Sequence, residues 1–170
     1  GRFTKQKNFP FLLNAFSEFS KKYEDYKLIL IGSGKDKKKL LNLTSALGLE
    51  TKIIFFNWKN NLNKHFGISK FFILPSLYEG SPNILIEALN QGIPCISSNC
   101  SGSTDILLNG KIGIIYEKND KAHLIKSMIK MHKKYSFFSK KSLRYMNTSK
   151  RFLIKPQSKK YLNFLSKFIA

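Results

Sequence analysis

Two glutamates, Glu79 and Glu87, carry carboxylates that could do chemistry, and seven residues separate them. The apolar run over residues 71–74 favours a strand, and Pro75 follows it directly, so Glu79 is expected in the loop after a strand. Glu87 belongs to a helical segment that is apolar nearly all round, so we expect its side chain to be buried. A buried carboxylate is costly unless something binds it.

The segment between the two glutamates contains the signals of a helix start. Ser81 is a typical N-cap, and Pro82 suits the first helical position, where its missing N–H costs nothing. We expect the helix to reach about Asn90, with Gly92 as its stop. The first turn offers free amides for an anion, at about Asn83, Ile84 and Leu85. An acid beside an anion site suits a ligand with both phosphates and hydroxyls, such as a nucleotide sugar.

The ordered string around both glutamates favours a ligand site over a simpler interpretation, in which Glu79 caps the helix or faces solvent and Glu87 pairs with a lysine. It reads Pro-Ser-Leu-Tyr-Glu-Gly-Ser-Pro-Asn-x-x-x-Glu-Ala-x-x-x-Gly-x-Pro over residues 75–94. This string resembles the E-x7-E signature of the retaining nucleotide-sugar glycosyltransferases known as glycosyl transferases group 1, which have the two-Rossmann GT-B fold. The resemblance covers essentially the whole chain, as the C-terminal, donor-binding half of such an enzyme.

The resemblance implies separate roles for the two acids. Glu79 would lie beside the donor sugar, where it binds hydroxyls or stabilises developing positive charge, and Glu87 would bind the ribose hydroxyls. The residues implied to face the diphosphate and the sugar are Gly80, Ser81, Pro82, Asn83, Ile84 and Leu85. No metal or cofactor is expected, because the helix dipole, Arg2 and Lys7 would supply the positive charge.

The first residues resemble a second element of the same family. Gly1-Arg2-Phe3-x-x-x-Lys7-Asn8 is similar to its Gly-Arg-x-x-x-x-Lys-Asn/Gly pattern, which follows the first strand of the domain. By this resemblance Arg2 and Lys7 would grip the donor diphosphate and stabilise charge on the departing nucleotide. The alternative is that two basic residues among thirty carry no function.

Two further loops resemble nucleotide contacts more weakly. Gly32-Ser33-Gly34 lacks the third glycine of a dinucleotide fingerprint, and a tight strand-to-helix turn explains it equally well. Asn57-Trp58 occupies the loop where the family packs backbone against the nucleotide base. Trp58 would either stack on the base or pack at a surface.

The charge and the amino-acid composition indicate which binding partners to expect. The formal net charge is +20, yet only three of the thirty basic residues are arginine, a bias that a low-GC genome would produce without functional reason. Nucleic-acid binders usually rely on arginine, and no recognition motif is visible, so no nucleic-acid partner is expected. The lysines either attract anionic lipid headgroups or only confer solubility. Cys95 and Cys100 are expected to be reduced cytosolic thiols, and with three scattered histidines they give no metal-binding spacing.

Strand-like runs alternate with helical patterns, at about residues 26–31, 53–56, 71–74, 95–97 and 112–116. This alternation predicts an α/β, Rossmann-like doubly wound parallel sheet with helices on both faces, followed by a helical C-terminus. The candidate loops all follow strands, so they are expected at the ligand-binding edge of the sheet. Residues 1–3 are interpreted as the tail of a strand whose beginning is missing. We therefore expect residues 1–170 to be one domain of a longer protein, whose N-terminal acceptor domain is absent.

Local signals also predict where individual helices begin and end, and which of their side chains point inward. Leu40, Leu41, Leu43 and Leu47 are expected to point inward, and Gly48 to end their helix. Thr104 is expected to cap a short helix over residues 105–108, and Asp120 with Asn119 to cap the helix that follows. The segment over residues 155–168 is either an amphipathic membrane-surface helix or, as we favour, a helix that packs on the N-terminal domain.

The resemblance therefore implies the donor-binding domain of a hexosyltransferase-type enzyme, which is expected to be inactive by itself. The whole protein would transfer a sugar from a nucleotide-diphosphate donor, UDP by family frequency, with retention of configuration. The acceptor would be a glycan or a lipid-linked glycan, in the synthesis of cell-surface polysaccharide, lipopolysaccharide or glycoprotein glycans. The alternative is a non-catalytic nucleotide-binding subunit that needs a separate acceptor-domain partner. Without a membrane span or signal peptide, the expected location is the cytoplasm, either free or at the inner face of the membrane.

Overall fold

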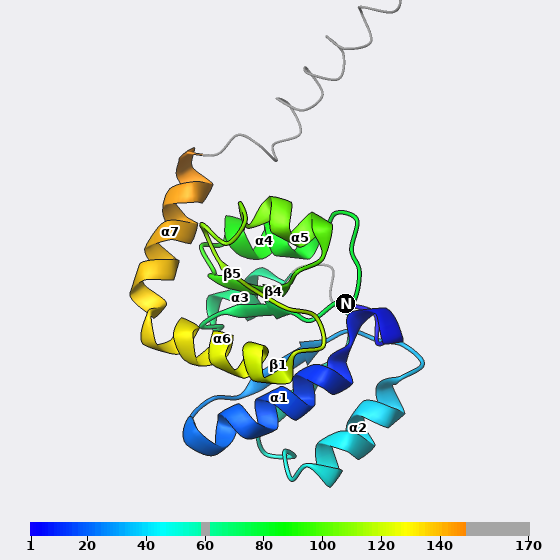
Figure 1. The fold of residues 1–170 in the computed structure, drawn as a ribbon. Helices are drawn as coiled ribbons and strands as arrows, with labels where there is room; N and C mark the ends of the chain where they lie inside the picture. Colours follow the sequence, from blue (N-terminus) through cyan, green and yellow to red (C-terminus); the bar gives the residue numbers. More distant parts are fainter. Residues whose placement is uncertain (59–61, 149–170) are drawn as a thin grey trace, which may run out of the picture.

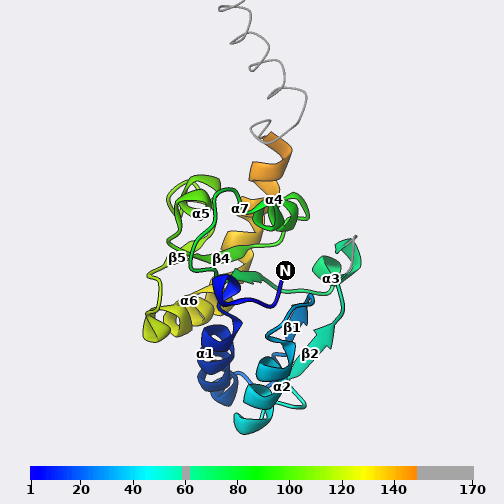
Figure 2. The same ribbon diagram turned by 90° about the vertical axis from the view of Figure 1, so that its right-hand side faces the viewer.

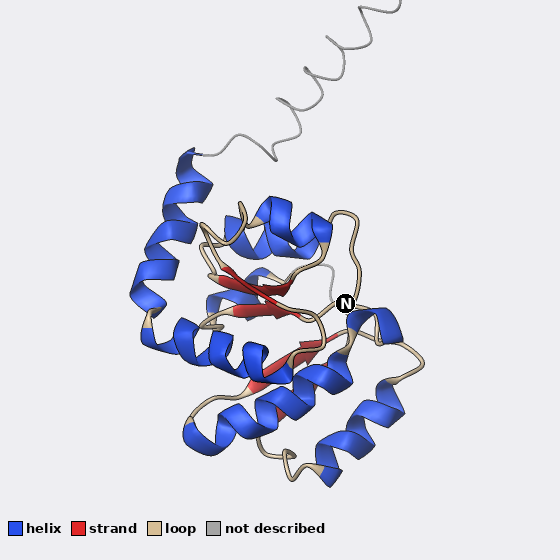
Figure 3. Ribbon diagram, viewed as in Figure 1, coloured by secondary structure: helices blue, strands red, loops and turns tan. Residues whose placement is uncertain are grey.

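The computed structural model describes residues 1–58 and 62–148. Helices surround two groups of short strands, with the helices in blue and the strands in red in Figure 3. In chain order the elements are η1 (Lys5–Lys7), α1 (Phe9–Lys22), β1 (Leu28–Ile31), α2 (Lys37–Ala46), β2 (Ile53–Phe56), α3 (Asn63–Gly67), β3 (Phe72–Leu74), α4 (Asn83–Asn90), β4 (Cys95–Ser98), α5 (Ser101–Ile106), β5 (Ile114–Tyr116), α6 (Lys121–Lys133) and α7 (Tyr135–Thr148).

The strands form a two-stranded sheet, β1-β2, and a three-stranded sheet, β3-β4-β5. Every pair is parallel, and a helix lies between each strand and the next along the chain, as the sequence pattern predicted. The α/β prediction is therefore confirmed. The sheets are separate pieces, however, because no ladder joins β1 to β3 within the described residues.

Helices cover both faces of the strands, which alternate their side chains between two cores. In β4, Ile96 joins the core shared with α1 and α6, whereas its neighbour Cys95 joins the core shared with α4 and α5. Figures 1 and 2 show α1, α2 and α6 on one side and α4 and α5 on the other. Burial raises the pKa of the Cys95 thiol, and both cysteines are buried free thiols.

Several local predictions are confirmed. Gly48 and Gly92 follow the ends of α2 and α4 with φ of +65° and +71°, the left-handed conformation that glycine adopts readily. Asp120 caps α6, since its Oδ1 accepts a hydrogen bond from the His123 amide at 2.8 Å. Phe3 is fully buried, and its amide donates to the Ser33 carbonyl at 2.7 Å.

Other local predictions are wrong. Ser81 is not the N-cap of α4; that position is Pro82, and no side chain caps the helix. Thr104 does not begin a helix either, because α5 starts at Ser101 and the Thr104 hydroxyl donates back to the Ser101 carbonyl at 2.7 Å. Leu41 was expected inward, but it is 45% exposed because α2 packs through Leu40.

The structure covers part of the predicted C-terminal helices. α7 is the part of the predicted helical C-terminus that the structure describes, and its Phe138 is buried in the core shared with α6. The predicted helix over residues 155–168 lies outside the described residues. Of the described residues, no helix is both long enough and apolar enough to cross a membrane.

Candidate functional site

Two loops that are far apart in sequence meet at the carboxyl edge of the strands. The Leu77 amide donates to the Gln6 carbonyl at 2.8 Å, and the Gln6 side-chain amide donates to the Tyr78 carbonyl at 3.0 Å. The loop before α1 is thereby attached to the loop between β3 and α4. Both loops were predicted as candidate sites, and the structure brings them together.

At this junction Lys7 and Glu79 form an ion pair between Nζ and Oε1. The two side chains are only 17% and 11% exposed. An ion pair so shielded from water interacts more strongly than one on the surface, and each partner would be costly to leave alone. Lys7 and Glu79 were predicted as catalytic residues from two separate motifs, and they touch.

Glu87 is in a different environment from the one predicted. The side chain is exposed, because α4 buries Leu85, Ala88 and Leu89 and turns this position outward. The expectation of a buried carboxylate is therefore wrong: half-buried Ile84 and Ile86 made the helix look apolar all round. No ion pair to Glu87 forms within residues 1–58 and 62–148.

The first turn of α4 offers fewer free amides than predicted. The Leu85 amide donates to the Pro82 carbonyl at 2.8 Å, so it is not available to a ligand. The helix starts at Asn83, which is exposed. The amides of Asn83 and Ile84 are the first-turn donors that remain for an anion.

The glycine of α5 holds the Glu79 loop in place. A methyl group on Gly102 would collide with the carbonyl of Gly80 and lie 2.9 Å from Cδ of Pro82. Gly80 itself faces open space on its own Cβ side. The backbone of α5 thus supports the loop between Glu79 and α4, a role that the sequence did not reveal.

The buried Ser98 also holds the loop between β3 and α4 in place. The Ser98 hydroxyl at the end of β4 donates to the Ser76 carbonyl at 2.5 Å, and both residues are fully buried. Cys100 and Ser103 lie beside it, with Sγ and Oγ 2.9 Å apart. Sequence reasoning missed Ser98, although two consecutive serines in a buried strand were a usable signal, since buried hydroxyls need partners.

The other predicted site residues lie in further loops that follow strands, where the structure shows the contacts described next. Gly32 and Gly34 pack against the backbone of residues 1–3, where a Cβ on either glycine would clash, so packing requires glycine at both positions. Their contact with a nucleotide stays a prediction. Arg2 is exposed and pairs through its backbone with Ser33. The Asn57 side chain accepts a hydrogen bond from Lys37, and Trp58 is 55% exposed. Both follow β2, which belongs to a different sheet from β3, the strand that precedes Glu79.

The charged groups at the site were compared with what a metal ion would need. No group of three or more histidine, cysteine, aspartate or glutamate side chains there could hold a metal ion. The charges at the site are instead the ammonium of Lys7 and the carboxylate of Glu79, with the guanidinium of Arg2 on the surface.

Comparison with known proteins identifies the family of this domain. Residues 1–151 match the family described as glycosyl transferases group 1. The chain belongs to this family.

The group 1 domain has curated relatives in several bacteria. It is 32% identical over 129 residues to an uncharacterized glycosyltransferase of Haemophilus influenzae, covering 75% of this chain and 36% of that protein. It is 30% identical over 108 residues to the UDP-Gal:alpha-D-GlcNAc-diphosphoundecaprenol alpha-1,3-galactosyltransferase of Escherichia coli, covering 63% and 28%. The domain thus spans about a third of the length of the curated relatives it matches.

The fold of this group 1 domain is that of GT-B glycosyltransferase structures. A mutant of S. aureus TarM, solved with fondaparinux, alpha-GlcNAc-glycerol and UDP, superposes with a TM-score of 0.88 at 19% identity. The match covers 96% of this chain and 34% of TarM. The fold prediction made from the sequence is therefore confirmed.

Proposed function

We propose that this domain binds a nucleotide-diphosphate sugar at the edge where the loop before α1 meets the loop before α4. The observation that carries the proposal is the shielded ion pair between Lys7 and Glu79. It places a cation and a carboxylate beside the first turn of α4, where Asn83 and Ile84 offer amides to an anion. A diphosphate needs the cation and the amides, whereas a sugar hydroxyl needs the carboxylate.

In the proposed mechanism Lys7 exchanges partners when the donor binds. In the free domain Glu79 neutralises its ammonium. The entering diphosphate takes over part of this contact and leaves Glu79 free to accept hydrogen bonds from the sugar. As the sugar departs, negative charge grows on the leaving diphosphate, and Lys7, with Arg2 at the surface, stabilises that state more than the ground state.

Glu87 is proposed to bind the ribose hydroxyls, in keeping with the E-x7-E interpretation of the sequence. Its exposure makes the carboxylate accessible to a ligand that lies across the first turn of α4. UDP is the proposed nucleotide. Its support is the name of the E. coli relative, which uses UDP-Gal, and the UDP in the TarM complex.

The whole protein is proposed to transfer the sugar, with retention of configuration, to a glycan or lipid-linked acceptor. The E. coli relative is named for a diphosphoundecaprenol-linked acceptor, which supports this class. Acceptor recognition is assigned to a further domain, because the chain spans 36% and 28% of two relatives.

Nucleotide titration tests the donor site. UDP, GDP and ADP are titrated into the 170-residue chain while backbone amide NMR signals are followed. We expect UDP to bind most tightly and to shift the amides of Asn83 and Ile84. Lys7→Met should weaken UDP binding by about tenfold or more, since a charge-assisted contact contributes about 1.5–3 kcal/mol. Glu87→Gln should weaken binding of UDP but not of inorganic pyrophosphate.

Glu18→Gln is the matched control, because Glu18 also pairs with a lysine, Lys121, but on an exposed surface. It should leave every affinity unchanged. Equal UDP affinity in Lys7→Met and the unaltered chain would overturn the donor site. An enzyme that joins this domain to its acceptor domain and yields a product of inverted configuration would overturn the retaining mechanism alone.

A further inference from the structure

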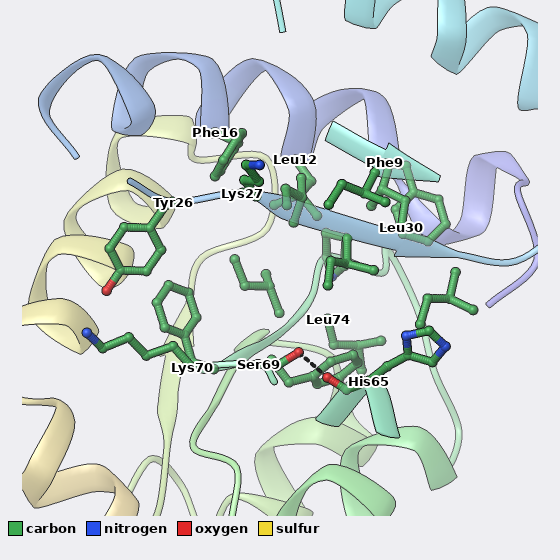
Figure 4. A pocket seen from close by; sticks show the side chains of 18 of the residues that line it. Phe9, Leu12, Phe16, Tyr26, Lys27, Leu30, His65, Ser69, Lys70 and Leu74 are labelled. Atoms are coloured by element: carbon green, nitrogen blue, oxygen red, sulfur yellow. Dashed lines mark hydrogen bonds between the residues drawn. The ribbon is translucent and has the colours of Figure 1, made fainter. Parts of the chain in front are cut away.

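Two cavities of the domain differ in the chemistry of their walls. The larger one, with a volume of about 550 Å³, lies between β1 and β3, and apolar side chains such as Leu30 and Leu74 line most of it (Figure 4). The second one, with a volume of about 350 Å³, lies between β5 and α6. Two lysines and a histidine line this α6 pocket, and none of its lining residues in the described part of the chain is acidic. None of the residues predicted to contact the donor lines it either, so its charge points to a separate ligand.

One face of α6 supplies the polar wall of the α6 pocket. The helix packs into the core through Leu124 and Met128, which are fully buried. The residues that line the pocket lie beside this apolar face, at positions i, i+3, i+4 and i+7 of the helix: His123, Lys126, Ser127 and Lys130. Core packing therefore sets the direction in which these side chains face.

Two of these side chains have an uncharged donor to offer. The Glu117 amide donates to Nδ1 of His123 at 3.2 Å. A neutral imidazole that accepts at Nδ1 carries its proton on Nε2, so that N–H remains for a ligand. Ser127 is only 2% exposed, and its hydroxyl makes no hydrogen bond within residues 1–58 and 62–148. Since a buried hydroxyl without a partner is costly, a ligand that accepts its hydrogen bond would be favoured.

Carboxylates do not neutralise the lysines of the pocket. Lys126 and Lys130 form no ion pair with another described residue. All ten acidic residues of the chain precede α6, so α6 and α7 contain none. The two that are nearest in sequence are engaged elsewhere, because the Glu117 carboxylate bonds to the side chain of Asn99 and Asp120 caps α6. The pocket therefore keeps a net positive charge.

β5 adds a backbone donor from the opposite wall. It is the last strand of the β3-β4-β5 sheet, so its outer edge bonds to no other strand in the described part of the chain. The Tyr116 carbonyl accepts a hydrogen bond from the Asn99 amide at 2.9 Å, on the β4 side. Because successive residues of a strand direct their backbone groups to opposite edges, the Ile115 amide points to the outer edge, beside the pocket that this residue lines.

We propose that the α6 pocket binds the phosphate group of a small, soluble phosphate monoester. Such a group carries close to two negative charges and three acceptor oxygens at neutral pH. The two lysine ammonium groups match the charge, and the uncharged donors of His123, Ser127 and Ile115 match the oxygens. A volume of about 350 Å³ is within the range of small-molecule sites, so the esterified part fits as well. A phospholipid headgroup is the poorer match, because a phosphodiester carries a single charge.

A phosphate titration tests the α6 pocket. Inorganic phosphate and glycerol 3-phosphate are added to the 170-residue chain at constant ionic strength, and backbone amide NMR signals are followed. We expect saturable shifts at Ile115 and Ser127 with both compounds. Lys126→Met and Lys130→Met should each weaken the affinity by about fivefold or more, since each removes a charge-assisted contact. Lys133→Met is the matched control, because it removes the same charge from α6 outside the pocket, and it should change the affinity by less than about twofold.

Several results would overturn the proposal. One is the lack of a saturable shift at Ile115 with either compound. Another is an equal loss of affinity in Lys126→Met and Lys133→Met, which would indicate a general positive field instead of a site. A third is sedimentation with phosphatidylglycerol vesicles that is lost in Lys126→Met while glycerol 3-phosphate gives no shift, since a lipid headgroup would then be the occupant.

The proposed donor site is tested separately from the α6 pocket. Lys7→Met should weaken any phosphate contact at Asn83 and Ile84, yet leave the phosphate titration at Ile115 unchanged. A weaker response at Ile115 in Lys7→Met would assign the shift to the donor edge and contradict the α6 pocket. Either proposal can therefore fail while the other holds.

Discussion

The two glutamates of the candidate site are separated by seven residues in sequence, but their surroundings are opposite. Glu79 is shielded, paired with Lys7 and held by a loop that rests on α5 and β4. Glu87 is exposed on the outer side of α4. The comparison shows that the local sequence determines which element carries each glutamate. Contacts with distant parts of the chain determine whether that glutamate is buried and which side chain it pairs with.

The partners of Glu79 come from distant parts of the sequence. Lys7 is 72 residues away, and Gly102 and Ser98 belong to the next units of the fold. The surroundings of Glu87 depend instead on the rotation of a single helix. A change that disturbs distant contacts should therefore affect Glu79 strongly, and a change at Glu87 should affect ligand binding alone.

The largest effect is expected from Gly102→Ala. The added methyl group would collide with the Gly80 carbonyl, so the backbone that carries Glu79 must shift. Overpacking of this kind lowers the free energy of unfolding by about 1–3 kcal/mol, and we expect the upper end because the obstacle is backbone. Urea unfolding measures the loss. Gly80→Ala is the control, since its methyl group enters open space; equal losses in the two variants would contradict the contact.

Removal of one partner of the shielded pair comes next. Lys7→Met leaves the Glu79 carboxylate with little water and no cation, so we expect the free energy of unfolding to fall by about 2 kcal/mol at pH 7. Lys121→Met breaks the exposed pair with Glu18, whose partners are 47% and 45% exposed, and should cost less than about 1 kcal/mol. Chemical denaturation of both variants tests the order; a reversed order would show that shielding adds nothing to the Lys7–Glu79 pair.

The pH dependence of stability offers a smaller effect. The pKa of the Gly1 ammonium is lowered to about 6 in the folded chain, by burial and by Lys7, from an ordinary value near 8.0. Between these two pH values the unfolded chain binds more protons than the folded chain, so stability rises with pH from 6 to 8. Acetylation of the amino group should flatten that rise, as thermal midpoints of both forms across the range would show. A rise of the same size after acetylation would assign it to other groups.

The smallest effect is expected from Glu87→Gln. An exposed carboxylate without an ion pair in the described residues contributes little, so the free energy of unfolding should change by less than about 0.5 kcal/mol. Thermal denaturation tests the effect of Glu87→Gln on stability, and the UDP titration tests its effect on ligand binding. A large loss of stability would show that Glu87 has a structural role that its exposure conceals.

Much of the architecture could be predicted from the sequence because its signals are local. Apolar runs such as residues 53–56, the stop at Gly92 and the cap at Asp120 depend on neighbours within a few positions. The order of strands and helices then determined parallel pairing, and parallel pairing put the candidate loops at one edge. The motif residues Lys7 and Glu79 followed from recognisable strings.

Only the tertiary structure decided what required a second segment of chain. The pairing of Lys7 with Glu79, the support of the Glu79 loop by Gly102 and Ser98, and the exposure of Glu87 depend on which faces meet after folding. The predicted caps at Ser81 and Thr104 show in addition that a local cap preference, worth about 1 kcal/mol, did not set where α4 and α5 begin. Sequence alone determined the elements and their order, because those are set by short-range preferences. Tertiary packing decided the surroundings of each acid, because burial and charge pairing are properties of contacts between distant residues.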